Sequence, residues 1–459
     1  MSRASGTLVA RSVSKSYGET LVLDRVSVAV TPGSRVGIVG PNGIGKTTLL
    51  RVLASVETAD HGTVALEPPS ATIAYLPQEG RVATRSGGEA ARAKLEAVMS
   101  EGADVVLLDE PTNDLDFAGL ELLERFVESH RGGLVAVSHD RVFLELMTRI
   151  IEFDAETRRV REFAGGWSAF EAERRLARER HQDAYRRSAA ERRRVEEQAR
   201  RMREWEQRGY GQGRKKKKTK DVRRTFERKL SRVEQVEKPW APWRLELELS
   251  PGHRSGEVVA RLERIVVDRG GFQLGPLDFE LGQGERLALT GRNGVGKTTL
   301  LRALLGELPL TSGRRWVGPS TVFGELPQGA GPFSGRAPLL EAFTRSSGLP
   351  PTEARTLLAK FALGADDAYR PGGSLSPGER SRATLALLAA CGVNTLVLDE
   401  PTNNLDLEAI EQLEAALAGF VGTIVLVTHD RRFLESFGAT RTIDLGKAQG
   451  WAEGRDAVR

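Results

Sequence analysis

A short glycine-rich segment occurs twice in the 459-residue chain, and this repeat limits the possible folds more than any other feature. Residues 40–48 are Gly-Pro-Asn-Gly-Ile-Gly-Lys-Thr-Thr, and residues 291–299 are Gly-Arg-Asn-Gly-Val-Gly-Lys-Thr-Thr. Both copies place Gly-x-x-x-x-Gly-Lys-Thr between a short apolar run and a helical pattern. In such a loop, backbone N–H groups and the helix N-terminus face a phosphate. The repeat therefore predicts two phosphate-binding α/β domains.

The spacing of the other shared motifs shows where the two copies differ. Asp-Glu-Pro-Thr-Asn-x-Leu-Asp occurs at residues 109–116 and again at 399–406, which is an offset of 290 residues. The offset between the two glycine-rich loops is only 251 residues. The first copy therefore lacks about 40 residues, and all of them are missing between Gln78 and Ser86.

Short β-branched and apolar runs alternate with helical pattern in each copy, which is typical of an α/β fold. The runs predicted to be buried strands are residues 35–39, 105–108 and 134–137 in the first copy and 286–289, 396–398 and 424–427 in the second. We predict three parts: an α/β domain at residues 1–165, a linker at 166–245 and a second α/β domain at 246–459.

The linker carries the positive charge of the chain. The whole chain has 67 Lys and Arg against 62 Asp and Glu, a net charge of +5. Residues 171–238 alone have 25 basic and 13 acidic residues, a net charge of +12, so the remainder carries −7. Residues 169–207 contain neither Gly nor Pro and predict one helix of roughly 55–60 Å. Residues 219–237 predict a second helix, which makes the linker a long α-helical hairpin.

A basic tip is predicted where the two linker helices meet. A solvated charge run is the simplest interpretation of such a tip, but a basic hairpin on an acidic body favours a phosphate backbone as its partner. Tyr210 lies between glycines and is placed to stack on a base or sugar of RNA. The predicted RNA contacts are Arg208, Tyr210, Arg214, Lys215, Lys216, Lys217 and Lys218.

Side chains suited to ATP and Mg²⁺ chemistry recur in both copies. A Lys at the end of the glycine-rich loop reaches the β and γ phosphates, and the Thr after it and an Asp at a strand end ligate Mg²⁺. The phosphate-binding lysines are Lys46 and Lys297, and the predicted Mg²⁺ ligands are Thr47, Asp109, Thr298 and Asp399. Each Asp is followed by Glu110 or Glu400, the candidates to orient or deprotonate the attacking water. His139 and His429 are candidates to contact the γ phosphate.

These motifs resemble those of the ATP-binding cassette (ABC) ATPases, over roughly 370 residues. In that family two domains pair head to tail and hold two ATP molecules between them. The resemblance implies glutamine loops at Gln78 and Gln328, and signature sequences that begin at Ser86 and Ser376 and contain Gly88 and Gly378. It implies a helical subdomain at residues 329–375, which the first copy lacks. The further nucleotide contacts that it implies are Tyr17 on adenine and, in the two loops, Gly40, Asn42, Gly43, Gly45, Thr48, Gly291, Asn293, Gly294, Gly296 and Thr299.

Two cassettes in one chain with a charged linker resemble the ABC-F branch, whose members include translation factors and antibiotic-resistance proteins that enter the ribosomal exit site. Residues 165–170, Gly-Gly-Trp-Ser-Ala-Phe, resemble the element that opens the linker in that branch. The resemblance implies the ribosome as partner, with rRNA and the P-site tRNA near the linker tip. Resistance by ribosomal protection is the leading function. The alternatives are a housekeeping translation factor, a detached ATPase subunit of a drug exporter and a deletion-damaged relative.

Two departures from the family pattern predict functional asymmetry. The signature at Ser86 has no helical subdomain behind it, so the site built on Lys297 is predicted to be the weaker one. Tyr17 is suited to stack on adenine in the first copy, whereas the aligned stretch of the second has no aromatic residue and Phe272 is a weak substitute. The site built on Lys46, completed by Ser376, is predicted to be intact.

Composition excludes other classes of protein. No run of about 18 apolar residues is present, so no membrane span is expected. The N-terminus lacks the apolar core of a signal peptide. Cys391 is the sole cysteine, which points to the cytoplasm, and its apolar neighbours predict a buried side chain. The expected protein is a cytoplasmic monomer.

Overall fold

The computed structural model describes residues 6–78, 87–113, 115–154, 157–208, 257–326, 331–361, 363–403 and 405–448. The chain divides into two compact units, one formed by Met1–Trp167 with Trp243–Arg459 and the other by Ser168–Pro242. The first unit contains both α/β copies, which are named here the first domain (β1–β9 and α1–α4) and the second domain (β10–β17 and α7–α14). The predicted boundaries at residues 165/166 and 245/246 stay a prediction.

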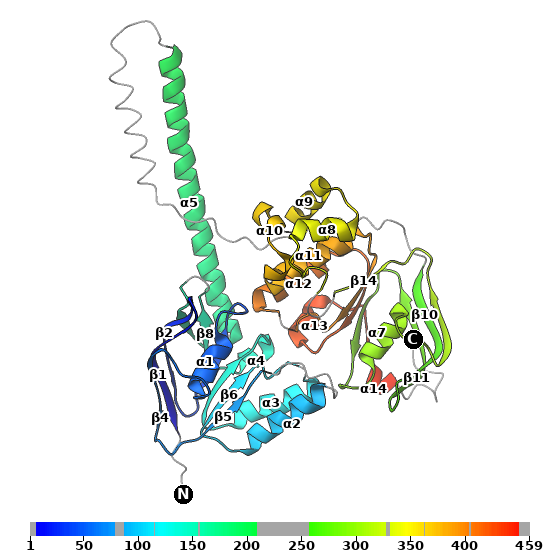
Figure 1. The fold of residues 1–459 in the computed structure, drawn as a ribbon, viewed down its shortest axis with the longest axis horizontal. Helices are drawn as coiled ribbons and strands as arrows, with labels where there is room; N and C mark the ends of the chain where they lie inside the picture. The colour runs from blue at the N-terminus through cyan, green and yellow to red at the C-terminus, as the bar shows by residue number, and fades with distance from the viewer. Residues whose placement is uncertain are drawn as a thin grey trace. The chain divides into compact units, whose positions relative to one another are not determined.

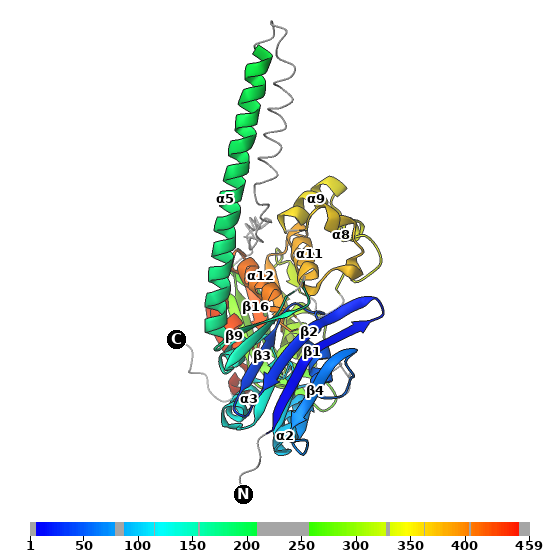
Figure 2. The same ribbon diagram turned by 90° about the vertical axis from the view of Figure 1, so that its left-hand side faces the viewer.

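Two sheets form the framework of the first domain (Figures 1 and 2). The antiparallel sheet has the order β2-β1-β4, with β1 at Thr7–Tyr17, β2 at Thr20–Val30 and β4 at His61–Glu67. The other sheet has the order β5-β6-β7-β3-β8-β9 and is parallel except for β9. Its strands are β3 Arg35–Val39, β5 Ile73–Leu76, β6 Val105–Asp109, β7 Gly133–Val137, β8 Arg149–Phe153 and β9 Val160–Ala164. The helices are α1 Lys46–Leu53, α2 Gly87–Ser100, α3 Phe117–Ser129 and α4 Arg141–Glu145.

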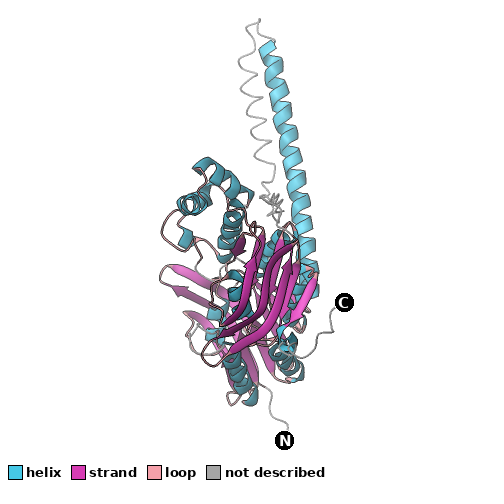
Figure 3. Ribbon diagram, turned by 90° about the vertical axis from the view of Figure 1, so that its right-hand side faces the viewer, coloured by secondary structure: helices cyan, strands magenta, loops and turns pink. Residues whose placement is uncertain are grey.

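The second domain repeats this arrangement and adds helices (Figure 3). Its antiparallel sheet has the order β11-β10-β13, with β10 at Val258–Asp268, β11 at Gln273–Gly282 and β13 at Ser312–Val317. Its parallel sheet has the order β14-β15-β16-β12-β17, with strands at Phe323–Glu325, Thr395–Asp399, Thr423–Val427, Arg286–Thr290 and Arg441–Asp444 in that order. The helices are α7 Lys297–Leu305, α8 Leu339–Ser347, α9 Pro351–Lys360, α10 Ala365–Tyr369, α11 Pro377–Ala390, α12 Leu407–Ala418, α13 Arg431–Phe437 and α14 Leu445–Ala448.

The central strands are buried on both faces, which explains their continuous apolar runs. Every residue of β6 and of β7 is buried, as expected for parallel strands covered by other layers. The six sequence-predicted strands all occur, with ends that differ by at most one residue. The prediction of two α/β domains is therefore confirmed. Each parallel sheet ends its β6 or β15 strand at the Asp of the repeated Asp-Glu motif, which fixes the position of the site.

A helical layer is present in the second domain between β14 and α11, and the described residues of the first domain go from β5 to α2 without one. Figure 1 shows α8, α9 and α10 grouped beside α11 and α12. Helix α2 of the first domain is the counterpart of α11, and the two helices differ on the face that α11 buries. Ala386 of α11 is 0 % exposed within the core of the second domain, whereas its counterpart Glu96 is exposed and pairs with Arg92 at 3.0 Å. The first domain thus has a charged surface where the second has a buried contact.

The described part of the linker is one helix, α5, at Trp167–Arg208. It matches the helix that the sequence predicts at residues 169–207 and is 42 residues long, or roughly 63 Å. The predicted second helix and the tip, with Tyr210, Arg214 and Lys215–Lys218, lie outside the described residues. None of the described helices is long and apolar enough to cross a membrane.

Cys391 is exposed, so the prediction of a buried side chain is wrong. Its apolar neighbours belong to α11, but Cys391 itself is the C-terminal cap of that helix. The chain turns there into Gly392, whose φ is +66°, and this places the cap at the surface.

Candidate functional site

The two phosphate loops have matching local geometry. Each helix after the loop begins at the lysine, and the glycine before it caps the helix with φ of +118° at Gly45 and +104° at Gly296. That left-handed conformation is accessible to glycine at little cost. A side chain at Gly45 would also meet the body of the protein, because its Cβ would lie 2.6 Å from Val22 Cγ1. Both constraints explain why the loop needs glycine before its lysine.

Each loop lysine is buried and donates to the carbonyls of its own loop. Lys46 Nζ lies 2.7 Å from Gly40 O, and Lys297 Nζ lies 2.6 Å from Gly291 O. Burial lowers the pKa of both ammonium groups, and the carboxylates of Glu110 and of Glu400 act in the opposite direction. The two cations are thus placed at the head of a helix, where a phosphate would gain both the helix N-terminus and a charge-assisted hydrogen bond.

The strand-end aspartates fit a hard cation. Thr298 Oγ1 donates to Asp399 Oδ2 at 2.8 Å, so the two predicted Mg²⁺ ligands of the second domain are in contact. In the first domain Asp109 is 2 % exposed, and its carboxylate interacts with the hydroxyl of Thr47, the other predicted Mg²⁺ ligand. Burial raises the pKa of Asp109, and the hydrogen bond from Thr47 and then the charge of Lys46 act in the opposite direction. Mg²⁺ prefers hydroxyl and carboxylate oxygens of this kind, so the residues present fit the ion.

Glu110 and Glu400 occupy a strained but fixed backbone position directly after the strand. Their φ angles are +51° and +47°, a region that a residue with a side chain rarely adopts. Glu110 N donates to Val137 O at 2.9 Å, and Glu400 N donates to Val427 O at the same distance. The next strand therefore holds each glutamate in place, and strain of this kind is common at functional sites.

The histidines lie beside these glutamates. His139 Nε2 is 3.2 Å from Glu110 Oε1, and His429 Nε2 is 3.5 Å from Glu400 Oε1. Burial raises the pKa of Glu110 to about 7, with Asp109 adding to the rise and Lys46 opposing it. Burial lowers the pKa of His139 well below its usual range, and burial followed by the charge of Lys297 lowers that of His429 to about 4. In the first domain, a neutral His139 beside a Glu110 of raised pKa suits a general base and its positioning partner.

The two sites differ in how the histidine is held. His429 Nε2 lies 2.9 Å from Lys297 Nζ, and His429 N donates to Glu400 Oε2 at 3.3 Å. The ring of Phe117, from the first domain, packs edge-on against His429 with centroids 5.3 Å apart. His139 likewise contacts its glutamate and donates its backbone N–H to Glu110, and the Nδ1 atoms of both histidines are buried without a hydrogen-bond partner. The contacts with Lys297 and Phe117 are therefore what distinguish His429.

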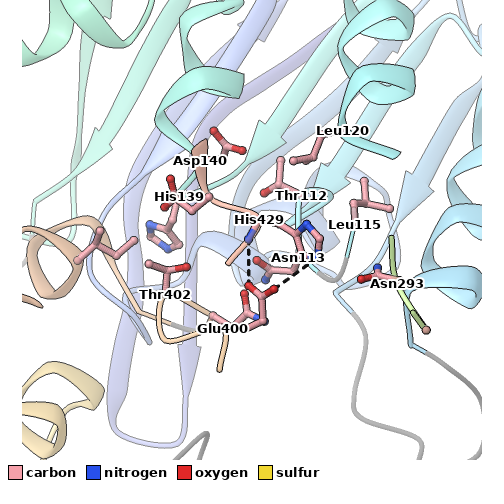
Figure 4. Close-up of a pocket in the computed structure, with 14 residues that line it drawn as sticks. Thr112, Asn113, Leu115, Leu120, His139, Asp140, Asn293, Glu400, Thr402 and His429 are labelled. Carbon is pink, nitrogen blue, oxygen red and sulfur yellow. Dashed lines mark hydrogen bonds and ion pairs between the residues drawn. The ribbon is translucent and has the colours of Figure 1, made fainter. Parts of the chain in front are cut away.

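A cavity of about 290 Å³ lies between the domains, and His139 of one site and His429 and Glu400 of the other line it (Figure 4). His139, Asp140 and Thr112 line it from the first domain, and His429 and Glu400 line it from the second. The remaining lining residues are Asn113, Leu115, Leu120, Asn293, Gly294, Thr402, Asn403, Ile410 and Asp430.

The phosphate loops also contact the opposite domain directly. Asn42 N donates to Asp406 Oδ2, and Asn293 N donates to Asp116 Oδ2, each at 3.3 Å. Each loop thus meets the segment after the other domain's Asp-Glu pair, so the contact is reciprocal. Sequence reasoning missed these two aspartates as site residues, although both close the repeated Asp-Glu-Pro-Thr-Asn-x-Leu-Asp motif.

The signature segments are described to different extents. Ser376 caps α11, where its Oγ accepts from Glu379 N at 3.2 Å and Glu379 Oε2 accepts from Ser376 N at 2.7 Å. Gly378 lies in the first turn of α11, and Gly88 lies in the first turn of α2. Gln78 is exposed directly after β5. Ser86 and Gln328 lie outside the described residues.

The predicted adenine platform, Tyr17, is 48 % exposed at the end of β1. Its hydroxyl donates to Glu57 Oε1 at 2.6 Å, and Lys15 Nζ lies 5.7 Å from the ring centroid. These two neighbours orient the ring, and sequence reasoning did not single them out. Asp268, the last residue of β10, occupies the matching position in the second domain.

Phe272 supports the second phosphate loop and is not positioned as Tyr17 is. Its ring packs under the second phosphate loop, where a Cβ on Gly296 would lie 2.8 Å from Phe272 Cζ. Val22 makes the same contact beneath Gly45 in the first domain. The place of Phe272 is therefore that of Val22, a supporting contact below the loop.

We expect Asp430→Asn to stabilise the protein in a pH-dependent manner. Burial raises the pKa of Asp430 from 3.8 to about 6, with the charges of Asp140 and Glu414 adding to the rise and that of Arg141 opposing it. The unfolded chain releases this proton more readily, so the wild type loses stability as the pH rises from about 4 to 6. At pH 7.5 the free energy of unfolding of the variant should exceed that of the wild type by up to about 3 kcal/mol. The thermal midpoint of the variant should be higher accordingly.

The gap in thermal midpoint should shrink as the pH falls toward 4. Asp430 also caps α13 by accepting from Phe433 N at 2.9 Å, and Asn caps a helix equally well. A gap that stays constant over this pH range would show that the carboxyl does not titrate as described.

Comparison with known proteins places these sites in a family. The family model described as ABC transporter matches residues 23–85 and 274–403. The chain is 32% identical to the tylosin resistance ATP-binding protein TlrC of Streptomyces fradiae, over 94% of this chain and 96% of that protein. It is 30% identical to the ribosome protection protein VmlR of Bacillus subtilis (92% and 84% covered) and 28% identical to the energy-dependent translational throttle protein EttA of Escherichia coli (92% and 89%).

A solved structure shares the fold at lower identity. The archaeal ribosome recycling factor aABCE1, solved in complex with the ribosomal stalk protein aP1, superposes with a TM-score of 0.56 and 19% identity, covering 94% of this chain and 86% of that chain. This likeness extends over both domains and concerns the fold alone. With the nearly full-length similarity to TlrC and the two nucleotide sites described above, the chain belongs to the ABC-F family of tandem ABC ATPases, which bind and hydrolyse ATP.

Proposed function

We propose that this ATPase binds the ribosome under the control of ATP and protects it from an antibiotic. The observation that carries the proposal is the similarity to TlrC and VmlR over more than nine-tenths of this chain, the first named for tylosin resistance and the second for ribosome protection. The proposed location of the protein is the cytoplasm, where ribosomes are found. Mg²⁺ is the proposed partner of ATP, held by Asp109 with Thr47 and by Asp399 with Thr298.

The described half of the linker supports an RNA partner. Helix α5 contains 13 Arg and 9 acidic residues within 42 residues. Arg side chains suit phosphate recognition because the planar guanidinium offers several donors in a fixed geometry. A long basic helix attached to an ATPase can bind the phosphate backbone of an RNA that lies far from the nucleotide sites.

The site geometry supports ATP as the switch. Each phosphate loop meets the opposite domain through Asp406 or Asp116, so a bound phosphate changes an interface and not only one domain. A ligand shifts such an equilibrium only by its differential affinity for the two states. ATP held between the domains would favour the paired state, and hydrolysis with phosphate loss would remove that preference.

Two other functions remain as alternatives. Similarity to EttA at 28% identity favours a housekeeping translation factor, which would bind ribosomes without changing drug susceptibility. The match to the ABC transporter family model favours a detached exporter subunit, which would bind a membrane partner in place of ribosomes. The charge of α5 is the feature that the exporter alternative does not explain.

The test is sedimentation of ribosomes with the Glu110→Gln/Glu400→Gln double variant in the presence of ATP. If Glu110 and Glu400 are the catalytic bases, this variant binds ATP without hydrolysing it and stays in the ribosome-bound state. We expect it in the ribosomal pellet with ATP and in the supernatant with ADP. Its absence from the pellet would contradict ribosomal function and favour the exporter alternative.

A second pair of measurements separates the remaining functions. Replacing Lys215, Lys216, Lys217 and Lys218 by Ala in the double variant should weaken pelleting and its dependence on salt, while the same change in the wild type leaves ATP turnover without ribosomes intact. Expression of the wild type in a susceptible host, tested against a panel of ribosome-targeting drugs, distinguishes resistance from a housekeeping role.

A further inference from the structure

Two ion pairs cross between the domains next to the catalytic histidines. Arg141 holds Glu414 with both ends of its guanidinium, at 3.0, 3.1 and 3.2 Å, and Ser436 Oγ donates to the same carboxylate at 3.1 Å. Arg431 Nη1 lies 2.8 Å from Glu124 Oε1. The two arginines are 290 residues apart and so are the two glutamates, so the pairs are equivalent members of the repeat.

The helices that carry these glutamates also contact the opposite phosphate loop. Asp116 caps α3 and accepts from Asn293 N of the second domain, and Glu124 follows two turns later on the same helix. Asp406 caps α12 and accepts from Asn42 N of the first domain, and Glu414 follows two turns later. Each helix therefore touches the facing domain at two points, its phosphate loop and its histidine segment.

Both helices are anchored firmly in their own domain. Leu123 and Val127 of α3 are 0 % exposed, and Leu413 and Leu417 of α12 are 2 % and 3 % exposed. Such positions tolerate little movement, because protein interiors are close-packed. A displacement of one domain is thus transmitted along the helix to Glu124 or Glu414 without being absorbed on the way.

The arginines connect to the histidines through a short, rigid segment. Arg141 is two residues after His139, and Asp140 between them accepts from Val142 N at 2.8 Å and Phe143 N at 3.0 Å. The second domain repeats this, with Asp430 accepting from Phe433 N at 2.9 Å. Holding Arg141 or Arg431 therefore fixes the position from which His139 or His429 reaches its glutamate.

These pairs are protected from solvent more than ordinary surface pairs. The side chains of Arg141 and Glu414 are 10% and 17% exposed, and those of Arg431 and Glu124 are 28% and 20% exposed. Removal of one partner from such a pair leaves a poorly solvated charge, which costs more than the loss of an exposed pair. The bidentate geometry at Arg141 adds directional control that a single contact lacks.

We propose that Glu414 and Glu124 are positioning residues that act across the interface, Glu414 on His139 and Glu124 on His429. Neither glutamate touches the phosphate loop or the catalytic glutamate; each sets the histidine of the opposite domain. The state of one domain thereby controls the geometry of the other domain's catalytic pair. The proposal rests on His139 and His429 acting beside Glu110 and Glu400, and the test below reads the histidines separately from catalysis.

The first measurement is the NMR signal of each histidine ring in protein labelled at its six histidines. Glu414→Gln should shift the ring signal of His139 more than that of His429, and Glu124→Gln should do the reverse. Glu128 lies on α3 with an exposed side chain and provides the matched control, so Glu128→Gln should shift neither signal. Single substitutions at His139 and His429 assign the two signals.

The second measurement is steady-state ATP turnover by the same variants. We expect kcat to fall about tenfold with little change in KM, because a misplaced catalytic group slows the chemical step while ATP contacts remain. Arg141→Ala combined with Glu414→Ala should cost no more than either change alone, since both remove one interaction. Glu414→Asp keeps the charge, shortens the side chain and serves as the milder variant if Glu414→Gln lowers the thermal midpoint.

The proposal is tested by whether each glutamate variant shifts the NMR signal of the histidine in the opposite domain. Ring signals that shift only for the histidine of the same domain, or equally for both histidines, would overturn the proposal. So would additive costs for Arg141→Ala and Glu414→Ala. If the signals cross as expected but turnover does not change, the positioning stands and the assigned role of the histidines in ATP hydrolysis fails.

Discussion

ATP turnover by the Glu110→Gln variant is expected to fall about 10²- to 10³-fold, the largest effect of any single substitution in the first domain. Glu110 is held at a φ of +51° beside His139, and burial raises its pKa to about 7. Gln keeps the size and the hydrogen-bonding atoms but cannot accept a proton from water. The measurement is phosphate release at saturating ATP, with KM determined in parallel.

The same substitution at Glu400 should have a smaller effect on total turnover. The family resemblance assigns to its site the signature of the first domain, where the described residues place no helix between β5 and α2. The family resemblance assigns Ser376 to the site of Glu110, and Ser376 caps α11 with a reciprocal pair of hydrogen bonds to Glu379. Equal losses of turnover in the two variants would contradict the predicted asymmetry.

Folding of the Glu110→Gln variant provides the control for this prediction. A buried carboxyl with a raised pKa is charged at a cost above pH 7, and the neutral amide avoids that cost. The thermal midpoint of the variant should therefore match or exceed that of the wild type at pH 8. A lower midpoint would assign the loss of turnover to misfolding.

The parts of the fold that the sequence predicts are those set by local pattern. The strands at residues 35–39 and 105–108 were predictable because their apolar runs leave no polar face. The phosphate loops were predictable because their backbone conformation requires glycine. The candidate catalytic pairs could be named from the repeat, since Glu110 and His139 recur at a constant offset, and their role in hydrolysis stays a prediction. In each case the signal lies within a few consecutive residues.

The interface contacts could not be predicted in this way. Arg141 and Glu414 are 273 residues apart, and nothing in either local sequence identifies the other as its partner. The burial of Cys391 was predicted wrongly because a run of apolar neighbours does not reveal where a helix ends. Phe272 was compared with Tyr17 by residue type, whereas packing beneath Gly296 makes it the counterpart of Val22.

One position on α2, Glu96, is not what a recent deletion would leave. A recent loss of the helical layer would leave apolar side chains of α2 facing solvent, in the positions that are buried in α11. Glu96 instead stands where α11 has Ala386, and it pairs with Arg92 one turn away. Leu95 and Val98 remain buried against the domain, at 1 % and 8 % exposed. Ala93, the counterpart of the buried Ala383, is exposed, so the polar replacement is found at Glu96 and not over the whole face.

Substitution of the phosphate-loop lysine is expected to have the second large effect, on ATP binding. Lys46→Ala removes a cation that lies among Asp109, Glu110 and the loop carbonyls, and leaves the two buried carboxylates without their nearest positive charge. A charge-assisted hydrogen bond to phosphate is worth about 1.5–3 kcal/mol, so the affinity of this site for ATP should fall roughly 10- to 150-fold. The measurement is titration with a fluorescent ATP analogue.

Lys297→Ala is the matched variant, because Lys297 donates to Gly291 O and Arg292 O as Lys46 does to Gly40 O and Pro41 O. If the site of Lys46 carries most of the hydrolysis, Lys46→Ala lowers turnover more than Lys297→Ala, although each variant loses tight binding at one site. The opposite order of the two losses would place the main hydrolytic site on Lys297. Since Asp109 and Glu110 repel each other once Lys46 is gone, added Mg²⁺ should partly restore the thermal midpoint of Lys46→Ala, which a purely steric role of the lysine does not predict.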